Sequence, residues 1–195
     1  MRIWLFHPLI FYPLALLLAG LAITVSLKPQ AWPREPAPVA AASTQGALVF
    51  SGEAFDSPHP SPDQNLTVIR DFWGTAQTLR VAVHQDQPLP PTPNDRGVRL
   101  LLTPENAAAL NGRLLTLEVS FDALPVNAAQ ALAVSVQGEG PVVWVSQALP
   151  NQNATLRFEL PAQTNVNAIG LRAINSGGNA AFGLEITRIR IIPHA

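Results

Sequence analysis

The chain has 195 residues with 12 basic and 13 acidic side chains, which gives a formal net charge of −1. All acidic residues lie at or after Glu35, and the basic residues form no stripe that could follow a phosphate backbone, so we expect no nucleic-acid partner. The absence of cysteine excludes disulfides, thiolate metal sites and a cysteine nucleophile.

The first predicted element is a membrane-spanning helix. Residues 3–27 carry no Asp, Glu, Lys or Arg and are bracketed by Arg2 and Lys28. A helix of about 25 residues is roughly 37 Å long, whereas the hydrocarbon core of a bilayer is about 30 Å thick. We therefore predict a transmembrane signal-anchor helix over residues 1–27, in contact with the lipid bilayer through residues 3–27. A cleaved signal peptide is the alternative, but its apolar region would be shorter and its cleavage site nearer.

The charges that flank this segment are nearly balanced, with Arg2 on one side and Lys28 and Arg34 on the other. We expect the short N-terminal tail to lie inside, as in an uncleaved signal-anchor. The arginine-rich, lysine-poor composition is typical of bacteria. These features together predict a single-pass protein of the bacterial inner membrane, with its C-terminal domain in the periplasm.

A Pro/Ala-rich linker is predicted over residues 28–46. It contains four closely spaced prolines, followed by an alanine-rich run: Pro29, Pro33, Pro36 and Pro38. Such prolines favour extended polyproline II structure, which acts as a semi-rigid spacer.

The remaining residues, 47–195, are predicted to form one domain with a hydrophobic period of two. In the clearest segment, apolar Leu115, Leu117, Val119 and Phe121 alternate with polar neighbours. Short strands separated by Pro- and Gly-rich turns indicate an all-β antiparallel sandwich. One short helix is expected near residues 104–110, where Thr103 caps its start and Pro104 takes its first position.

Two predicted strands depart from simple alternation. Residues 142–149 are apolar on both parities around Trp144, as expected for a strand that is covered on both faces. In the last strand, residues 184–192, the buried parity changes between Ile186 and Ile189. A β-bulge near Thr187 would keep one face of that strand buried.

The order of elements over residues 96–192 resembles that of carbohydrate-binding-module-like jelly rolls, also called galactose-binding-like domains. The segments that carry the resemblance are Gly112–Val119, Gln137–Gly140, Leu156–Pro161 and Gly183–Ile191. The resemblance implies a jelly-roll β-sandwich and glycan binding, although such sandwiches also serve as protein-binding and structural modules.

A glycan site needs aromatic faces that stack on sugar C–H surfaces, together with polar groups that bond hydroxyls. The candidate ligand-binding residues are Trp73, Phe72, Trp144, Arg172 and Asn175. For two of them packing is favoured over ligand binding: a place in the core for Trp144, between Val143 and Val145, and packing under a loop for Trp73.

No catalytic pattern is present in the sequence. The four histidines are scattered, no nucleophile elbow or phosphate-binding loop occurs, and the loop aspartates match turn formers. We therefore expect no enzyme activity, no catalytic residue, no metal site and no cofactor. The leading hypothesis is a membrane-anchored bacterial envelope protein with a non-catalytic, outward-facing binding module for a glycan or cell-wall polysaccharide. The alternative is a protein-interaction or structural subunit of an envelope complex.

Overall fold

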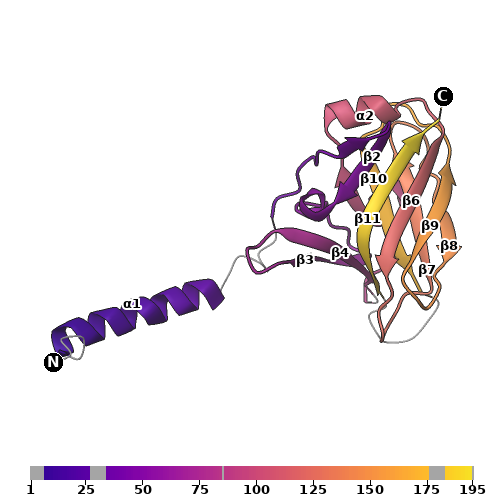
Figure 1. The fold of residues 1–195 in the computed structure, drawn as a ribbon. Helices are drawn as coiled ribbons and strands as arrows, with labels where there is room; N and C mark the ends of the chain where they lie inside the picture. The colour runs from indigo at the N-terminus through magenta and orange to yellow at the C-terminus, as the bar shows by residue number, and fades with distance from the viewer. Residues whose placement is uncertain (1–6, 27–33, 85, 176–182, 195) are drawn as a thin grey trace. The chain divides into compact units, whose positions relative to one another are not determined.

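The chain divides into two units, Met1–Pro33 and Arg34–Ala195 (Figure 1). The computed structural model describes residues 7–26, 34–84, 86–175 and 183–194. In the first unit the described structure is helix α1, Pro8–Ser26, which contains Pro13.

Helix α1 does not support the predicted membrane span. It begins at Pro8, later than the charge-free run begins, because proline lacks a backbone N–H and suits the first turn of a helix. Within the described part of the chain, no helix is both long enough and apolar enough to cross a membrane. Residues 3–6 and 27 of the predicted span, and 28–33 of the predicted linker, lie outside the described residues.

The second unit is built from two antiparallel sheets. The larger sheet has seven strands, in which β11 pairs with β2 and β4 along one edge and with β6 along the other. Its strands are β1 (Ala42–Thr44), β2 (Ala47–Ser51), β3 (Gln64–Arg70), β4 (Ala76–Val83), β6 (Leu115–Asp122), β9 (Ala154–Leu160) and β11 (Gly183–Pro193).

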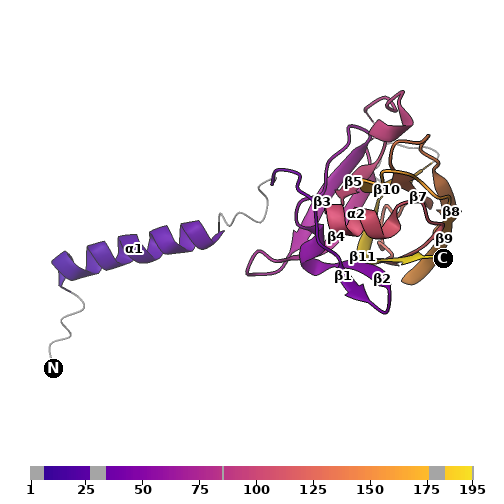
Figure 2. The ribbon, with the colours of Figure 1, turned by 90° about the horizontal axis from the view of Figure 1, so that it is seen from above.

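The smaller sheet has four strands in the order β5-β10-β7-β8. Their bounds are Val98–Leu101 for β5, Ala131–Gln137 for β7, Val145–Ala148 for β8 and Ala168–Ile174 for β10. The described chain also contains the 3-10 helices η3 (Gly52–Phe55) and η4 (Pro93–Asp95), and helix α2 (Pro104–Leu110). Helix α2 lies across one end of the sheets (Figure 1, Figure 2).

One hydrophobic core joins the two sheets, so the predicted all-β antiparallel sandwich is confirmed. Its fully buried side chains come from both sheets and include Phe50, Leu117, Phe158, Leu132 and Ile169. The short helix is found where the sequence predicts it, and the Thr103 hydroxyl accepts a hydrogen bond from the Asn106 N–H at 3.4 Å.

Of the two predicted strands that depart from simple alternation, one is found as predicted and the other is not. The predicted bulge is confirmed, because the register of β11 against β6 shifts between Ile186 and Arg188, and Ile186 and Ile189 are both fully buried. The segment around Trp144 differs from its prediction. Strand β8 covers only Val145–Ala148, and Trp144 precedes it. The Trp144 indole lies against Gly97 and Gly170 on the outer face of the sheet, while Val143 is 46% exposed.

Residues 34–46 belong to the β unit, although the sequence suggests a spacer there. Val39 is 8% exposed and donates its N–H to the Leu101 carbonyl at 2.8 Å. The Ala37 N–H donates to the Ser57 carbonyl at 3.2 Å. Proline-rich composition does not prevent a segment from pairing along a sheet edge, where few N–H groups are required.

Candidate functional site

The β3–β4 turn presents two aromatic side chains to solvent, Phe72 and Trp73. Their exposed fractions are 63% and 84%. Their ring centroids lie 5.2 Å apart with the planes at 86°, an edge-to-face pair. The turn projects from the body of the β unit (Figure 1, Figure 2). The favoured interpretation of Trp73 from the sequence, packing under a loop, is therefore wrong.

The turn is held by Asp71, which lies directly before the two rings. One carboxylate oxygen, Oδ1, accepts hydrogen bonds from the backbone N–H groups of Trp73 and Thr75, both at 2.9 Å. The Gly74 N–H donates to the Asp71 carbonyl at 3.0 Å, and Gly74 has a φ of +86° that favours glycine. The aromatic side chains are therefore carried by a backbone that is ordered before any ligand binds.

Arg70 anchors this turn to η3. Its guanidinium donates to the Gly74 carbonyl at 3.2 Å and to the Asp56 carbonyl at 3.0 Å, and it forms an ion pair with the Asp56 carboxylate. The Arg70 side chain is only 3% exposed. Arg34 forms a second ion pair with the other Asp56 oxygen.

The charge state of Asp56 follows from these contacts. Burial acts to raise the pKa of Asp56, but hydrogen bonds and charge from Arg70 and Arg34 outweigh it and hold the pKa below its usual range. Asp56 is therefore ionised near neutral pH, and it links the turn to the segment that enters the β unit.

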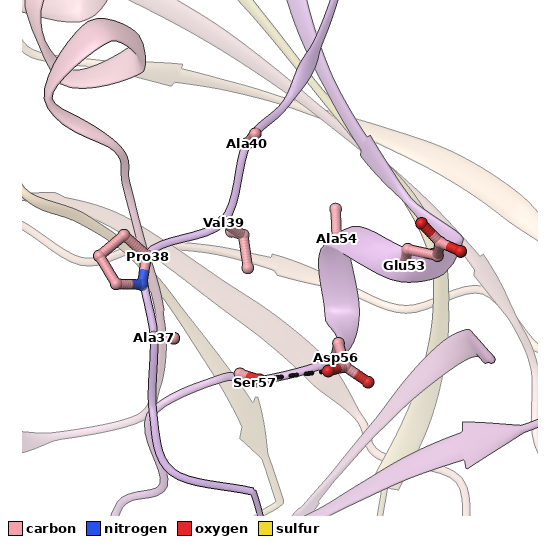
Figure 3. Close-up of a pocket in the computed structure, with 8 residues that line it drawn as sticks. All are labelled: Ala37, Pro38, Val39, Ala40, Glu53, Ala54, Asp56 and Ser57. Atoms are coloured by element: carbon pink, nitrogen blue, oxygen red, sulfur yellow. Dashed lines mark hydrogen bonds between the residues drawn. The ribbon is translucent and has the colours of Figure 1, made fainter. Parts of the chain in front are cut away.

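A pocket of about 320 Å³ adjoins Asp56. Its walls are the extended residues 37–40 and residues of the segment 53–57, which includes part of η3, and both apolar and polar groups line it (Figure 3). Polar groups at its edge come from Glu53, Asp56 and Ser57, and the Ser57 hydroxyl donates to Asp56 at 3.3 Å. Its volume lies at the lower end of the range for small-molecule sites.

These parts adjoin one another because a single guanidinium group contacts both the aromatic turn and the pocket residue Asp56. We call Phe72, Trp73, Arg70, Asp56 and the adjoining pocket the aromatic corner. The arrangement combines aromatic faces for stacking with hydrogen-bonding groups beside a concavity. Among the described residues, no three His, Cys, Asp or Glu side chains are grouped to hold a metal ion.

The other three predicted site residues lie elsewhere, on or beside the four-stranded sheet. Trp144 is half-buried and donates its Nε1–H to the Pro93 carbonyl at 3.1 Å. Arg172, on β10, donates to the Asp63 carboxylate at 3.0 Å, and Asn175 follows that strand. The favoured interpretation of Trp144 from the sequence, a place in the core, is wrong, because the indole lies on the outer face of the sheet against Gly97 and Gly170.

The five predicted residues therefore form two groups, one at each end of β3. Gln64, at the start of β3, accepts a hydrogen bond from the Ala173 N–H at 2.9 Å, next to Arg172. Arg70, at the end of β3, lies under the aromatic turn. A strand of that length spans about 20 Å. The two groups are too far apart for one small ligand.

Sequence reasoning missed Asp56, Arg70 and Arg34 as parts of the site. The ion pairs of Asp56 with Arg34 and Arg70 join residues that are far apart along the chain, and no local sequence pattern predicts them. The turn itself could have been predicted, because an Asp followed three residues later by Gly, as in Asp71 and Gly74, favours this turn geometry.

Comparisons with known proteins give structural similarity only. No known family model matches the chain, and no curated protein matches its sequence. The structure is similar to that of "BiXyn10A CBM1 APO", with 11% identity and a TM-score of 0.43 over 82% of this chain and all of the other.

Two further solved structures are also similar. One is the CBM22-1-CBM22-2 tandem domain from Paenibacillus barcinonensis Xyn10C, with 9% identity and a TM-score of 0.46 over 78% of this chain and 47% of the other. The second contains the CBM22-1 and GH10 modules of Clostridium thermocellum xylanase 10B, with 10% identity and a TM-score of 0.44 over 75% and 28%. This is the weak, fold-level resemblance to carbohydrate-binding modules that the sequence predicts.

Proposed function

We propose that the β unit is a non-catalytic binding module that recognises a glycan through the aromatic corner. The observation that carries the proposal is Trp73, which is 84% exposed on a turn held by Asp71 and Arg70. Exposing a large aromatic ring to water is unfavourable, so a prominent exposed ring on an ordered backbone points to a partner.

The chemistry of the corner suits a sugar. The apolar C–H face of a pyranose ring can stack on the indole, while the neighbouring phenyl ring, nearly perpendicular to it, closes one side. Glu53, Asp56 and Ser57 place oxygen atoms at the edge of the adjoining pocket, where they can bond to sugar hydroxyls. The ordered turn reduces the entropy lost on binding.

The cellular location of the protein and the chemical class of its partner stay predictions. The envelope setting rests on the sequence, and a protein partner is the alternative occupant of the same surface. A glycan is favoured because Arg70 joins the turn that carries the exposed rings to Asp56, which lines a pocket with further polar groups, and a glycan needs both kinds of group.

A glycan array with the purified full chain tests the proposal. Trp73→Ala should weaken binding by about 10- to 100-fold, which corresponds to about 1.4–2.8 kcal/mol, because the stacking surface is lost. Phe72→Ala should weaken it less. Leu114→Ala is the matched control, since Leu114 is 60% exposed and lies outside the corner. A folded protein that binds no glycan, or that binds equally well without Trp73, would refute glycan recognition at this site.

A further inference from the structure

Two buried polar atoms on the outer face of the four-stranded sheet have no hydrogen-bond partner among the described residues. They are the Ser135 hydroxyl and the Gln137 amide nitrogen. The two residues are 0% and 3% exposed. They alternate along β7 with the core residues Val134 and Val136, so both project from the face opposite the core. Buried polar groups are normally paired, so two unpaired ones side by side require an explanation.

Both atoms converge above Gly170. This glycine lies on β10 directly between Ser135 of β7 and Arg99 of β5 in the pairing register. A Cβ atom added to Gly170 would lie 2.3 Å from the Ser135 hydroxyl oxygen and 3.1 Å from the Gln137 nitrogen. Only glycine keeps the space above this point of the sheet available to those groups.

The indole of Trp144 covers the same space. Its Cη2 atom would lie 2.8 Å from a Cβ at Gly170 and 2.6 Å from a Cβ at Gly97. The ring therefore rests in a notch made by two glycines, and its N–H is bonded to the Pro93 carbonyl. Trp144 lies in the connection before β8 rather than in a strand, so no sheet pairing has to break for the ring to lift.

Two arginines lie on the face that carries the notch, Arg172 two residues after Gly170 on β10 and Arg99 opposite Gly170 on β5. Arg172 is paired with Asp63, which is 4% exposed. Arg99 instead directs one guanidinium nitrogen at the two ring nitrogens of His59, at 3.1 and 3.2 Å. Within the described ranges, Arg99 has no ion pair with a carboxylate. One cationic side chain on this face is therefore not compensated by an acid.

We propose that Ser135, Gln137 and Arg99 form a binding site for an acidic sugar, a hexuronate, and that Trp144 covers this site in the unbound protein. The hydroxyl and the amide N–H groups donate to sugar oxygens, and Arg99 balances the carboxylate. When the ligand enters, the indole leaves the notch and packs against the C–H face of the sugar. This site is separate from the aromatic corner and does not depend on it.

Titration of the full chain with sodium D-glucuronate tests this inference. The indole N–H resonance of Trp144, assigned with Trp144→Phe, should shift as its bond to Pro93 breaks. D-glucose and acetate should each bind at least tenfold more weakly than glucuronate. Ser135→Ala and Gln137→Leu should each weaken glucuronate binding tenfold or more. Both should also raise the Tm of the unbound protein by about 2–4 °C, since each removes an unpaired buried polar group.

Leu114→Ala is the matched control and should leave glucuronate affinity unchanged, since Leu114 is exposed and lies outside both sites. Loss of glucuronate binding in Trp73→Ala, with none in Ser135→Ala and Gln137→Leu, would assign the sugar to the aromatic corner and overturn this inference, while the proposed function would stand. No shift of the Trp144 resonance, equal binding of glucose, or a lower Tm in both polar-to-apolar variants would each overturn it.

Discussion

Asp56 connects more of the aromatic corner than any other single side chain does. Its carboxylate bonds Arg70 below the turn, Arg34 at the start of the β unit and Ser57 at the pocket. Arg70 is almost fully buried, so its charge depends on this partner. Removing one member of such a pair costs more than the pair itself contributes, because the other charge is left unpaired.

Asp56→Asn should lower the free energy of unfolding at pH 7 by about 1–3 kcal/mol, since Arg70 keeps its charge and loses its counterion. The folded-state pKa of Asp56 is depressed, so its stabilising contribution is complete above the unfolded pKa and is lost as pH falls through the folded pKa. Chemical denaturation at pH 7 and pH 3 should show a smaller difference between variant and wild type in acid.

A difference between the two proteins that stays constant with pH would contradict this account. Some acid sensitivity should remain in Asp56→Asn. Although burial acts to raise the pKa of Glu185, its hydrogen bonds to Arg80 and Thr78 hold that pKa below the usual range.

At the scale of single elements, β11 shows how one extra residue keeps a long strand amphipathic. Leu184 and Ile186 before the bulge, and Ile189 and Ile191 after it, are all buried. Thr187 is the extra residue, and its hydroxyl donates to the Ser120 carbonyl at 3.2 Å. Without the bulge, residues on one side of it would face the wrong way.

Deletion of Thr187 should therefore abolish folding, because it would turn either the Ile189–Ile191 side or the Leu184–Ile186 side of the strand out of the core. Circular dichroism and soluble yield would measure the loss. Thr187→Ala is the control, since it keeps the residue count and loses only one hydrogen bond, at a cost of about 0.5–1.5 kcal/mol. A folded deletion variant would show that the register is set elsewhere.

Sequence periodicity predicted this strand, its bulge and the buried parity of β6, because each follows from local alternation. It misassigned the run around Trp144, where apolar residues on both parities also occur when a loop folds back onto a sheet. Alternation reports which side of a strand is covered, but it does not report whether the covering element is a second sheet or a single ring.

At the scale of the β unit, residues 34–46 pack along the sheet as part of the unit and do not form a detached spacer. Residues 34–46 contribute Val39 to the core, one wall of the pocket and the Arg34 ion pair. Composition alone could not show this, because proline and alanine suit both an extended spacer and an extended edge segment.

A chain that starts at Arg34 should therefore fold, whereas one that starts at Gly46 should lose about 2–4 kcal/mol of unfolding free energy. The loss comes from the burial of Val39 and from the backbone bonds of Ala37 and Val39. Urea denaturation of the two chains measures it. Equal stability would show that the entering segment rests on the unit without stabilising it.

The candidate site was only partly predictable at this scale. All five predicted residues are described, but the structure separates them into two places, and the residues that organise each place were missing. Aromatic and arginine residues can be picked out as candidate binding residues from a sequence. That Gly170 and Ser135 are neighbours becomes visible only when the pairing of β5, β10 and β7 is known.

The glycine notch beneath Trp144 also affects how this chain tolerates mutation. At Gly97 and Gly170 the smallest possible change, one added methyl group, would meet the indole at 2.6 and 2.8 Å. The indole is not the only obstacle at either position. A Cβ at Gly97 would also meet the Leu171 carbonyl oxygen at 2.7 Å, where φ is +72°, and one at Gly170 would meet the Ser135 hydroxyl oxygen at 2.3 Å. Replacing Trp144 first therefore frees neither glycine, so lineages that lose the tryptophan should still keep both.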